Sequence, residues 1–123
     1  MAFEGSVDPA NVLEAALSLT EYTAAGAIAE KQGTVFLKTG TAGAFTLAAP
    51  TAGNPAADGD DGKRLLIVAE DAKAYTVTTP ASKIAGGNDT ATFGGAIGDL
   101  IELVAFGGVW YAANLINVSL SAV

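Results

Sequence analysis

The acidic side chains are the first place to look for chemistry in this sequence, because three of them gather in one short run. Asp58, Asp60 and Asp61 are interleaved with glycine between residues 58 and 62. Carboxylate oxygens are the ligands that Ca²⁺ prefers, but an EF-hand loop needs glycine at its sixth position, where this run has Lys63. The run is instead typical of a solvated turn that leads into a strand.

Asp99 and Glu102 are the one other pair of carboxylates to consider, because glycoside hydrolysis uses two of them. On a strand, residues three apart face opposite sides, so this pair does not converge on a substrate. The sequence has no histidine and no cysteine, which excludes Ser-His-Asp catalysis, thiolate zinc sites and cysteine nucleophiles. No glycine run fits the phosphate-binding pattern G-x-x-x-x-G-K-[ST]. We therefore predict a protein that is not an enzyme and that needs no cofactor or metal.

Two adjacent aromatic residues, Trp110 and Tyr111, follow the Gly107-Gly108 turn. Exposed aromatic rings on a sheet bind sugars or unpaired bases, whereas a tryptophan at the end of a small core fills space. The scarcity of nearby cations favours the core interpretation for Trp110. A carbohydrate-binding sheet face stays open as an alternative.

The composition predicts one small domain with a thin core. The chain has 123 residues, and half of them are apolar, but the large fillers include only five Phe, three Tyr, one Trp and one Met. Alanine and glycine bury little area, and burial stabilises by roughly 25 cal/mol per Å². A lone domain of this kind is marginally stable, so we expect an oligomer that shares its core.

Charge divides the chain into an acidic arm and a more balanced remainder. The net charge is −7, and residues 1–30 contain five acids but no Lys or Arg. Nucleic acid is a poor partner for such a chain, because phosphate binding is driven by cations. We expect the arm to be extended or briefly helical over residues 10–17. Its acidity is typical of a segment that keeps the chain soluble, and the alternative is that it docks on a basic surface of another protein. Its predicted partner-binding residues are Phe3, Glu4, Asp8, Leu13, Glu14 and Leu17.

Targeting and membrane signals are weak. The start of the chain lacks the basic residues and early apolar stretch of a signal peptide. The apolar run 100–120 contains Glu102, two glycines and two asparagines, which a membrane-spanning helix tolerates badly. We interpret this run as strands and expect no membrane partner.

From Gly33 onward, the apolar residues recur with a period of two, which is typical of strands with one packed face. This alternation is found in residues 34–38, 44–48, 74–79 and 116–121. The runs 65–69 and 100–106 are apolar at nearly every position, which predicts central strands covered on both faces. We predict eight or nine strands in an all-β domain over residues 31–123, mainly antiparallel and sandwich- or barrel-like, after an arm of residues 1–30.

The order of these segments resembles a family of small virion proteins. It runs from Gly43–Ala48 through Asp61–Val68, Tyr75–Thr78 and Ala91–Phe93 to Gly98–Leu103 and Gly107–Tyr111. It is similar to the Ala/Thr/Gly-rich proteins of tailed-bacteriophage head gene modules, including capsid decoration (cement) proteins. The resemblance covers roughly residues 17–114. It rests on the spacing of these segments along the chain and on their richness in small residues.

The resemblance implies a location and a partner. Such a protein is made in the host bacterial cytoplasm and sits on the outer capsid surface of the virion, where it binds the major capsid protein as a trimer and stabilises the expanded head. The alternative within the same class is a short head- or tail-fibre module that binds a receptor or carbohydrate.

Overall fold

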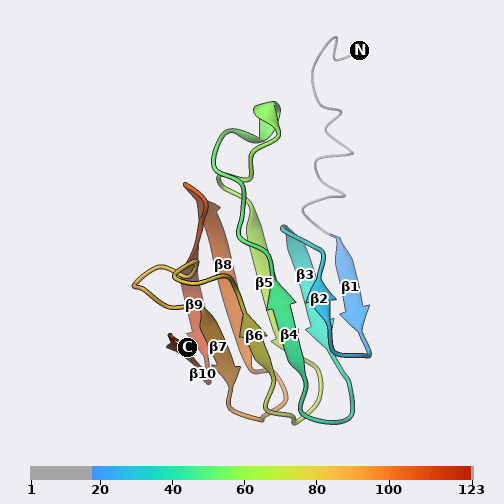
Figure 1. The fold of residues 1–123 in the computed structure, drawn as a ribbon. Coiled ribbons are helices and arrows are strands. Elements are labelled where there is room, and N and C mark those ends of the chain that lie inside the picture. Colours follow the sequence, from blue (N-terminus) through green and yellow to red (C-terminus); the bar gives the residue numbers. More distant parts are fainter. Residues whose placement is uncertain (1–17, 123) are drawn as a thin grey trace, which may run out of the picture.

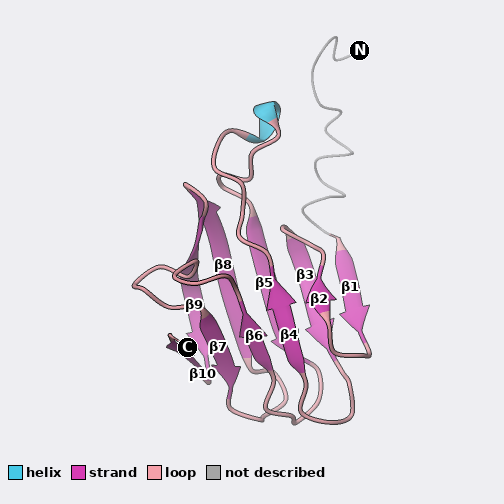
Figure 2. Cartoon of the chain, in the orientation of Figure 1, coloured by secondary structure: helices cyan, strands magenta, loops and turns pink. Residues whose placement is uncertain are grey.

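The computed structural model describes residues 18–122, which form a β-sandwich with almost no helix (Figures 1 and 2). A single 3₁₀ turn, η1 (Pro55–Ala57), interrupts the long loop before β5. The strands are β1 (Leu19–Tyr22), β2 (Ala27–Ile28), β3 (Gly33–Leu37), β4 (Ala44–Leu47), β5 (Arg64–Ala69), β6 (Thr76–Thr78), β7 (Thr90–Phe93), β8 (Leu100–Phe106), β9 (Val109–Ile116) and β10 (Val118–Ser121). The all-β prediction is confirmed.

The strands form two five-stranded sheets packed face to face. The first sheet has the order β1-β3-β5-β8-β9, and the second has the order β10-β7-β6-β4-β2. In Figure 1 the second sheet lies in front of the first. The architecture is therefore a sandwich, one of the two forms that the sequence predicted.

The first six strands alternate between the two sheets, so neighbours within each sheet run parallel. β1, β3 and β5 pair in parallel in the first sheet, and β2, β4 and β6 do so in the second. Parallel neighbours need a connection that returns the chain to the same end of the sheet. Here each such connection contains one strand of the opposite sheet. Antiparallel pairing begins only with β7 and β8, so the expectation of a mainly antiparallel domain holds for the C-terminal half alone.

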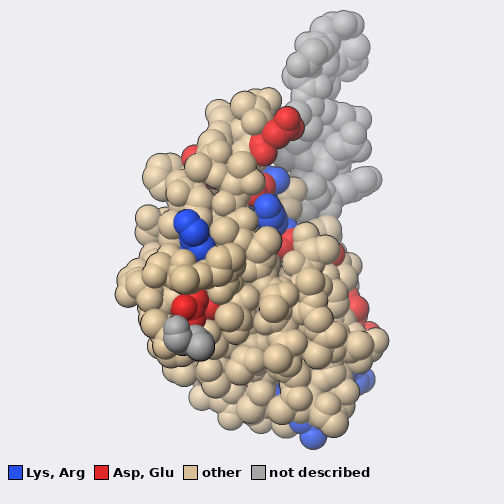
Figure 3. All heavy atoms as spheres, viewed as in Figure 1, with Lys and Arg blue, Asp and Glu red and all other residues tan. Residues whose placement is uncertain are grey.

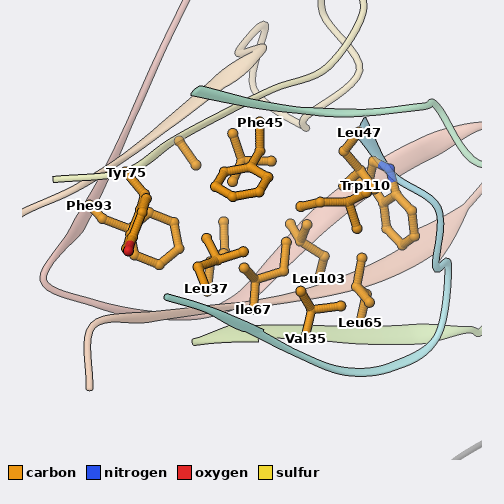
Figure 4. Packing of buried hydrophobic residues seen from close by; sticks show 14 of the residues in the cluster. Val35, Leu37, Phe45, Leu47, Leu65, Ile67, Tyr75, Phe93, Leu103 and Trp110 are labelled. Carbon is orange, nitrogen blue, oxygen red and sulfur yellow. The ribbon is translucent and has the colours of Figure 1, made fainter. Parts of the chain in front are cut away.

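The core lies between the sheets and is built from the alternating positions of both (Figure 4). Phe45 and Leu47 of the second sheet face Val35, Leu37 and Ile67 of the first. A chain of edge-to-face aromatic contacts crosses this interior, with centroids about 6 Å apart; it comprises Tyr22, Phe45, Tyr75 and Phe93. Edge-to-face pairs add stabilisation beyond that of the buried area.

The first two strands belong to the sandwich. β1 extends the first sheet beside β3, and β2 ends the second sheet beside β4. Ile28 is buried in the core, and Tyr22 packs against it. Residues 18–30 therefore lie in the β domain, whereas the prediction placed them in the arm. The helix predicted over residues 10–17 lies outside the described residues.

Two tight connections complete the C-terminal half. Gly107 and Gly108 have φ angles of 61° and 80° and join β8 to β9, as a two-residue hairpin with positive φ at both positions requires. Asn117, with φ of 53°, separates β9 from β10 and moves the chain from the first sheet to the second. The single strand predicted over residues 116–121 is therefore wrong, because Ile116 and Val118 belong to different sheets.

Candidate binding surface

Two of the three carboxylates in residues 58–61, those of Asp60 and Asp61, hold the long loop together rather than converging on a site. Asp60 is 5% exposed, and its carboxylate binds Lys63 at 2.8 Å, Lys31 at 3.2 Å and the Thr51 backbone N–H at 2.7 Å. Burial alone would raise the pKa of Asp60, but these three partners outweigh it and lower the pKa to about 2. The prediction of a solvated turn is thus wrong for Asp60, which anchors the loop.

The two neighbouring acids, Asp61 and Asp58, differ from each other. Asp61 accepts a hydrogen bond from the Gly107 backbone N–H at 2.9 Å, which ties the loop to the β8–β9 hairpin. Asp58 is exposed at the end of η1 with φ of 65°. Among residues 18–122, no group of three or more acidic, histidine or cysteine side chains is placed to hold a metal ion.

Asp99 and Glu102 face opposite sides of the first sheet, as their spacing predicts. Asp99 is 2% exposed and accepts hydrogen bonds from the backbone N–H groups of Gly95 and Ala96 and from the Asn117 side chain. Burial opposes ionisation of Asp99, yet these donors lower its pKa. Glu102 lies instead on the outer face, so the two carboxylates do not form a pair.

Trp110 is a core residue, which confirms the favoured interpretation of its sequence position. Its side chain is fully buried, and its indole N–H donates to the Ala48 carbonyl oxygen at 3.0 Å. Figure 4 shows Trp110 beside Leu47 and Leu65 at one end of the core. Tyr111 points the other way and is 46% exposed.

The outer side of the first sheet carries the most distinctive surface among the described residues. The register of the ladders aligns Phe36, Val68, Leu100 and Ile116 in one row across β3, β5, β8 and β9. We call this side the apolar face, and it consists of Leu19, Phe36, Leu66, Val68, Leu100, Val104, Phe106, Val109, Tyr111 and Ile116, with Glu21, Thr34, Arg64, Glu102 and Asn114 between them.

No described residue packs over the apolar face. Exposure is highest at its rims, where Leu19 is 67%, Phe106 61% and Ile116 48% exposed. The outward residues of β5 and β8 are half-buried by their own neighbours in the sheet. The sequence predicted that these two strands are covered on both sides. Within residues 18–122 that prediction is wrong, since only the inner side is covered.

The few charges on the apolar face are of both signs. Arg64 lies 3.9 Å from Glu102 in the middle of the face. At one corner, Lys38 lies 3.5 Å from Glu70, beside Glu21. A hydrogen bond with Glu70 and repulsion between the two carboxylates raise the pKa of Glu21. The face is thus apolar, with one balanced pair of charges near its centre and an excess of one negative charge at this corner.

The outer side of the second sheet is different in kind. Its registered rows consist of small hydroxyl and methyl side chains: Ala27, Ala44, Thr46, Thr76, Thr78, Thr90, Thr92, Ser119 and Ser121. We call this side the hydroxyl face. Figure 3 views it and shows hardly any charge over its middle. Threonine and serine are satisfied by water, so this face has less need of a partner than the apolar face.

The residues predicted to bind a partner cannot be placed on either face. All six lie in the part of the chain that the structure does not describe: Phe3, Glu4, Asp8, Leu13, Glu14 and Leu17. The apolar face was missed as a site, although its signal is visible in the sequence. Strands that are apolar on both sides, in a chain with so little else to cover them, indicate a missing partner.

Comparisons with models of known protein families, with characterised proteins and with solved structures find no significant match to this chain. The resemblance to phage head proteins therefore rests on the sequence features given above. No helix among residues 18–122 has the length and apolar character needed to cross a bilayer.

Proposed function

We propose that this chain is a non-enzymatic structural protein of a tailed-phage virion, which binds the outer capsid surface as a decoration or cement protein. The observation that carries the proposal is the apolar face. A contiguous exposed apolar patch on a small domain is typical of a protein–protein contact. The resemblance supplies the class of partner: the major capsid protein and further copies of the same chain in a trimer.

The charge of the chain supports a protein partner over nucleic acid or an anionic surface. The net charge is −7, and the first 17 residues contribute Glu4, Asp8 and Glu14 without any base. A basic patch on the shell attracts such an arm and speeds its association. In this proposal the arm reaches the capsid, while the sandwich forms the rigid body of the decoration.

Stabilisation of the head follows from mass action. A ligand that binds the expanded shell better than the unexpanded one shifts the equilibrium toward expansion. At a free concentration of 100 times its Kd, it stabilises each site by about 2.7 kcal/mol. Because one shell has many equivalent sites, these contributions add up, and a small protein can stabilise the whole expanded capsid.

The test is to mix the purified protein with empty expanded and unexpanded capsids of the phage that encodes it, and to measure bound protein by co-sedimentation. We expect saturable binding to expanded shells, weaker binding to unexpanded shells, and a higher temperature of shell disruption when the sites are filled. Failure of the full chain to bind expanded shells would contradict the proposal.

The arm can be tested separately. A variant lacking residues 1–16 is expected to lose occupancy on expanded capsids while keeping the circular dichroism spectrum of a β-sandwich. Undiminished binding would show that the arm is not the capsid contact.

The alternative, a fibre or carbohydrate-binding module, has no observation in its favour. A sugar platform built on Trp110 and Tyr111 needs both rings on one exposed face, and the Trp110 ring is buried. Binding to a glycan array, combined with no binding to capsids, would reverse this preference.

A further inference from the structure

We infer that the apolar face is the surface through which copies of this chain associate, each packing its apolar face against that of another copy. The inference concerns the protein alone and holds whether or not a capsid is its other partner. Two identical faces that meet form a two-fold contact, so the inference names a contact distinct from the three-fold one of the proposed trimer. Three observations carry it: the pattern of the buried strands, the size of the face and its charge.

The first observation is that β5 and β8 are built for a covered environment on both sides. Leu66 and Val68 of β5, and Leu100 and Val104 of β8, point outward as large apolar residues. The inner positions of the same strands are almost completely buried. Strands that are apolar on both sides occur where both sides are covered. A second sheet packed about 10 Å away provides such a cover.

The second observation is the size of the face. The area of the face can be approximated by giving all five strands the seven-residue length of β8. With strands about 4.8 Å apart and about 3.3 Å of length per residue, the face covers roughly 500 Å². Projecting side chains add to this area. Apolar patches on monomers reach about 300–600 Å², and each partner in a standard interface buries about 800 Å². The face, its polar positions included, thus lies in the upper part of the range for a free monomer and covers more than half of the area that one partner buries in a standard contact.

The third observation is that the charge on the face is self-complementary. Arg64 and Glu102 stand side by side near its centre, with side chains 63% and 34% exposed. When two such faces meet, the guanidinium of one copy can bind the carboxylate of another, so neither charge is left unpaired. A second copy presents both Arg64 and Glu102, so its charges can pair with those of the first copy.

The chain's own arm suits the face less well. Residues 1–17 contain Glu4, Asp8 and Glu14 and no base. An arm folded over the face would bring three negative charges toward Glu21 and Glu102, and like charges at close range are unfavourable. The same objection applies to any strongly acidic partner.

The contact is expected to centre on the β8–β9 hairpin. Three of the most exposed large apolar side chains of the apolar face lie there: Phe106, Tyr111 and Ile116. Aromatic and large apolar residues contribute most of the binding energy in protein contacts. β9 is also an edge strand of its sheet, so it lies where another copy has free access.

The test is the mass of the protein in solution. We expect the wild-type chain to sediment at a multiple of 12.2 kDa at micromolar concentration. The variant Phe106→Lys/Ile116→Lys is expected to sediment at 12.2 kDa, with Kd for association raised roughly 100-fold or more. Lysine reduces the net negative charge, so general repulsion between chains cannot explain this dissociation.

A matched control places the same two charges on the other side of the sandwich. Thr46→Lys/Thr92→Lys replaces exposed residues of the hydroxyl face and is expected to keep the wild-type mass. Fluorescence from the buried Trp110 reports in every variant whether the sandwich is folded. A folded face variant with the wild-type mass, or a control that dissociates equally, would overturn the inference.

A second measurement uses the absence of cysteine. Single cysteines introduced by Ile116→Cys or Thr92→Cys can each be labelled with pyrene, whose excimer emission reports two labels in contact. We expect excimer emission from the Ile116 site and none from the Thr92 site. A monomeric wild-type chain would overturn the inference. If deletion of residues 1–16 from that monomer increased the binding of a hydrophobic dye, the face would be assigned to the arm instead.

Discussion

Trp110 and Tyr111 are neighbours in β9 that point to opposite sides of the first sheet. The indole of Trp110 is fully buried and reaches across to the Ala48 carbonyl oxygen just beyond β4, at 3.0 Å, so it joins the two sheets. The Tyr111 side chain is 46% exposed on the apolar face. A single dipeptide therefore contributes one residue to the core and the next to the apolar face, and substitutions can separate the two.

Trp110→Ala is expected to lower the free energy of unfolding by about 3–5 kcal/mol, because it leaves a large cavity and removes the hydrogen bond to the Ala48 carbonyl oxygen. Chemical denaturation followed by circular dichroism measures this loss. Tyr111→Phe serves as the control, since it keeps the ring, and is expected to change stability by less than about 0.5 kcal/mol. Equal effects of the two substitutions would mean that Trp110 does not close the core.

Asp60 is expected to make stability depend on pH in the acidic range. Its pKa is 3.8 in the absence of partners and about 2 in the folded chain, so its contribution is complete above pH 4 and is lost as the pH falls toward 2. One pKa unit corresponds to about 1.4 kcal/mol, which gives a contribution of about 2 kcal/mol. Asp60→Asn is expected to remove this amount at pH 7 and to flatten the acid limb of the stability profile.

Asp58→Asn is the matched control for Asp60, because Asp58 lies exposed in the same loop and asparagine tolerates its positive φ. Its profile is expected to follow the wild-type chain. If Asp60→Asn also retained the wild-type acid limb, the pairing with Lys31 and Lys63 would contribute nothing to stability.

Several of the strands after residue 33 could be predicted from the sequence because their signals are local. Alternation of apolar and polar residues located β3, β4 and β6, and the glycine pair located the β8–β9 hairpin. The pairing of these strands could not be predicted in the same way. Whether β3 pairs with β4 or with β5 depends on contacts between segments far apart in the chain, and the alternation pattern is the same in both cases.

The candidate site was only partly predictable for a related reason. The sequence indicated that residues 65–69 and 100–106 are covered on both sides, but it did not show which side the chain itself covers. Register decides this: Ile67 and Ile101 face the core, whereas Leu66 and Leu100 face outward. The break at Asn117 was missed because its neighbours continue the alternation, although asparagine is a residue that tolerates positive φ.

Asn117 is expected to matter both through its backbone and through its side chain. It has φ of 53° where the chain changes sheets, and its amide donates to the Asp99 carboxylate at 3.0 Å. Asn117→Gly removes only the side-chain bond and is expected to cost about 1–2 kcal/mol. Asn117→Ala also places a Cβ in the left-handed region and is expected to cost about 1 kcal/mol more. Thermal unfolding compares the two, and equal losses would show that the backbone conformation carries no strain.

Glu21 is expected to limit stability at neutral pH. Its hydrogen bond with Glu70 and the repulsion between the two carboxylates raise its pKa, so the folded chain binds this proton more tightly than the unfolded chain does. The free energy of unfolding therefore falls as the pH rises through the window above 4.5, the ordinary pKa of the group. Glu21→Gln is expected to be more stable than wild type at pH 7, with the difference shrinking as the pH falls toward 4 and wild-type Glu21 is protonated. Asp58→Asn removes one negative charge from an exposed loop and controls for net charge. A Glu21→Gln variant no more stable at pH 7 than this control would show that the two carboxylates do not oppose each other in the folded protein.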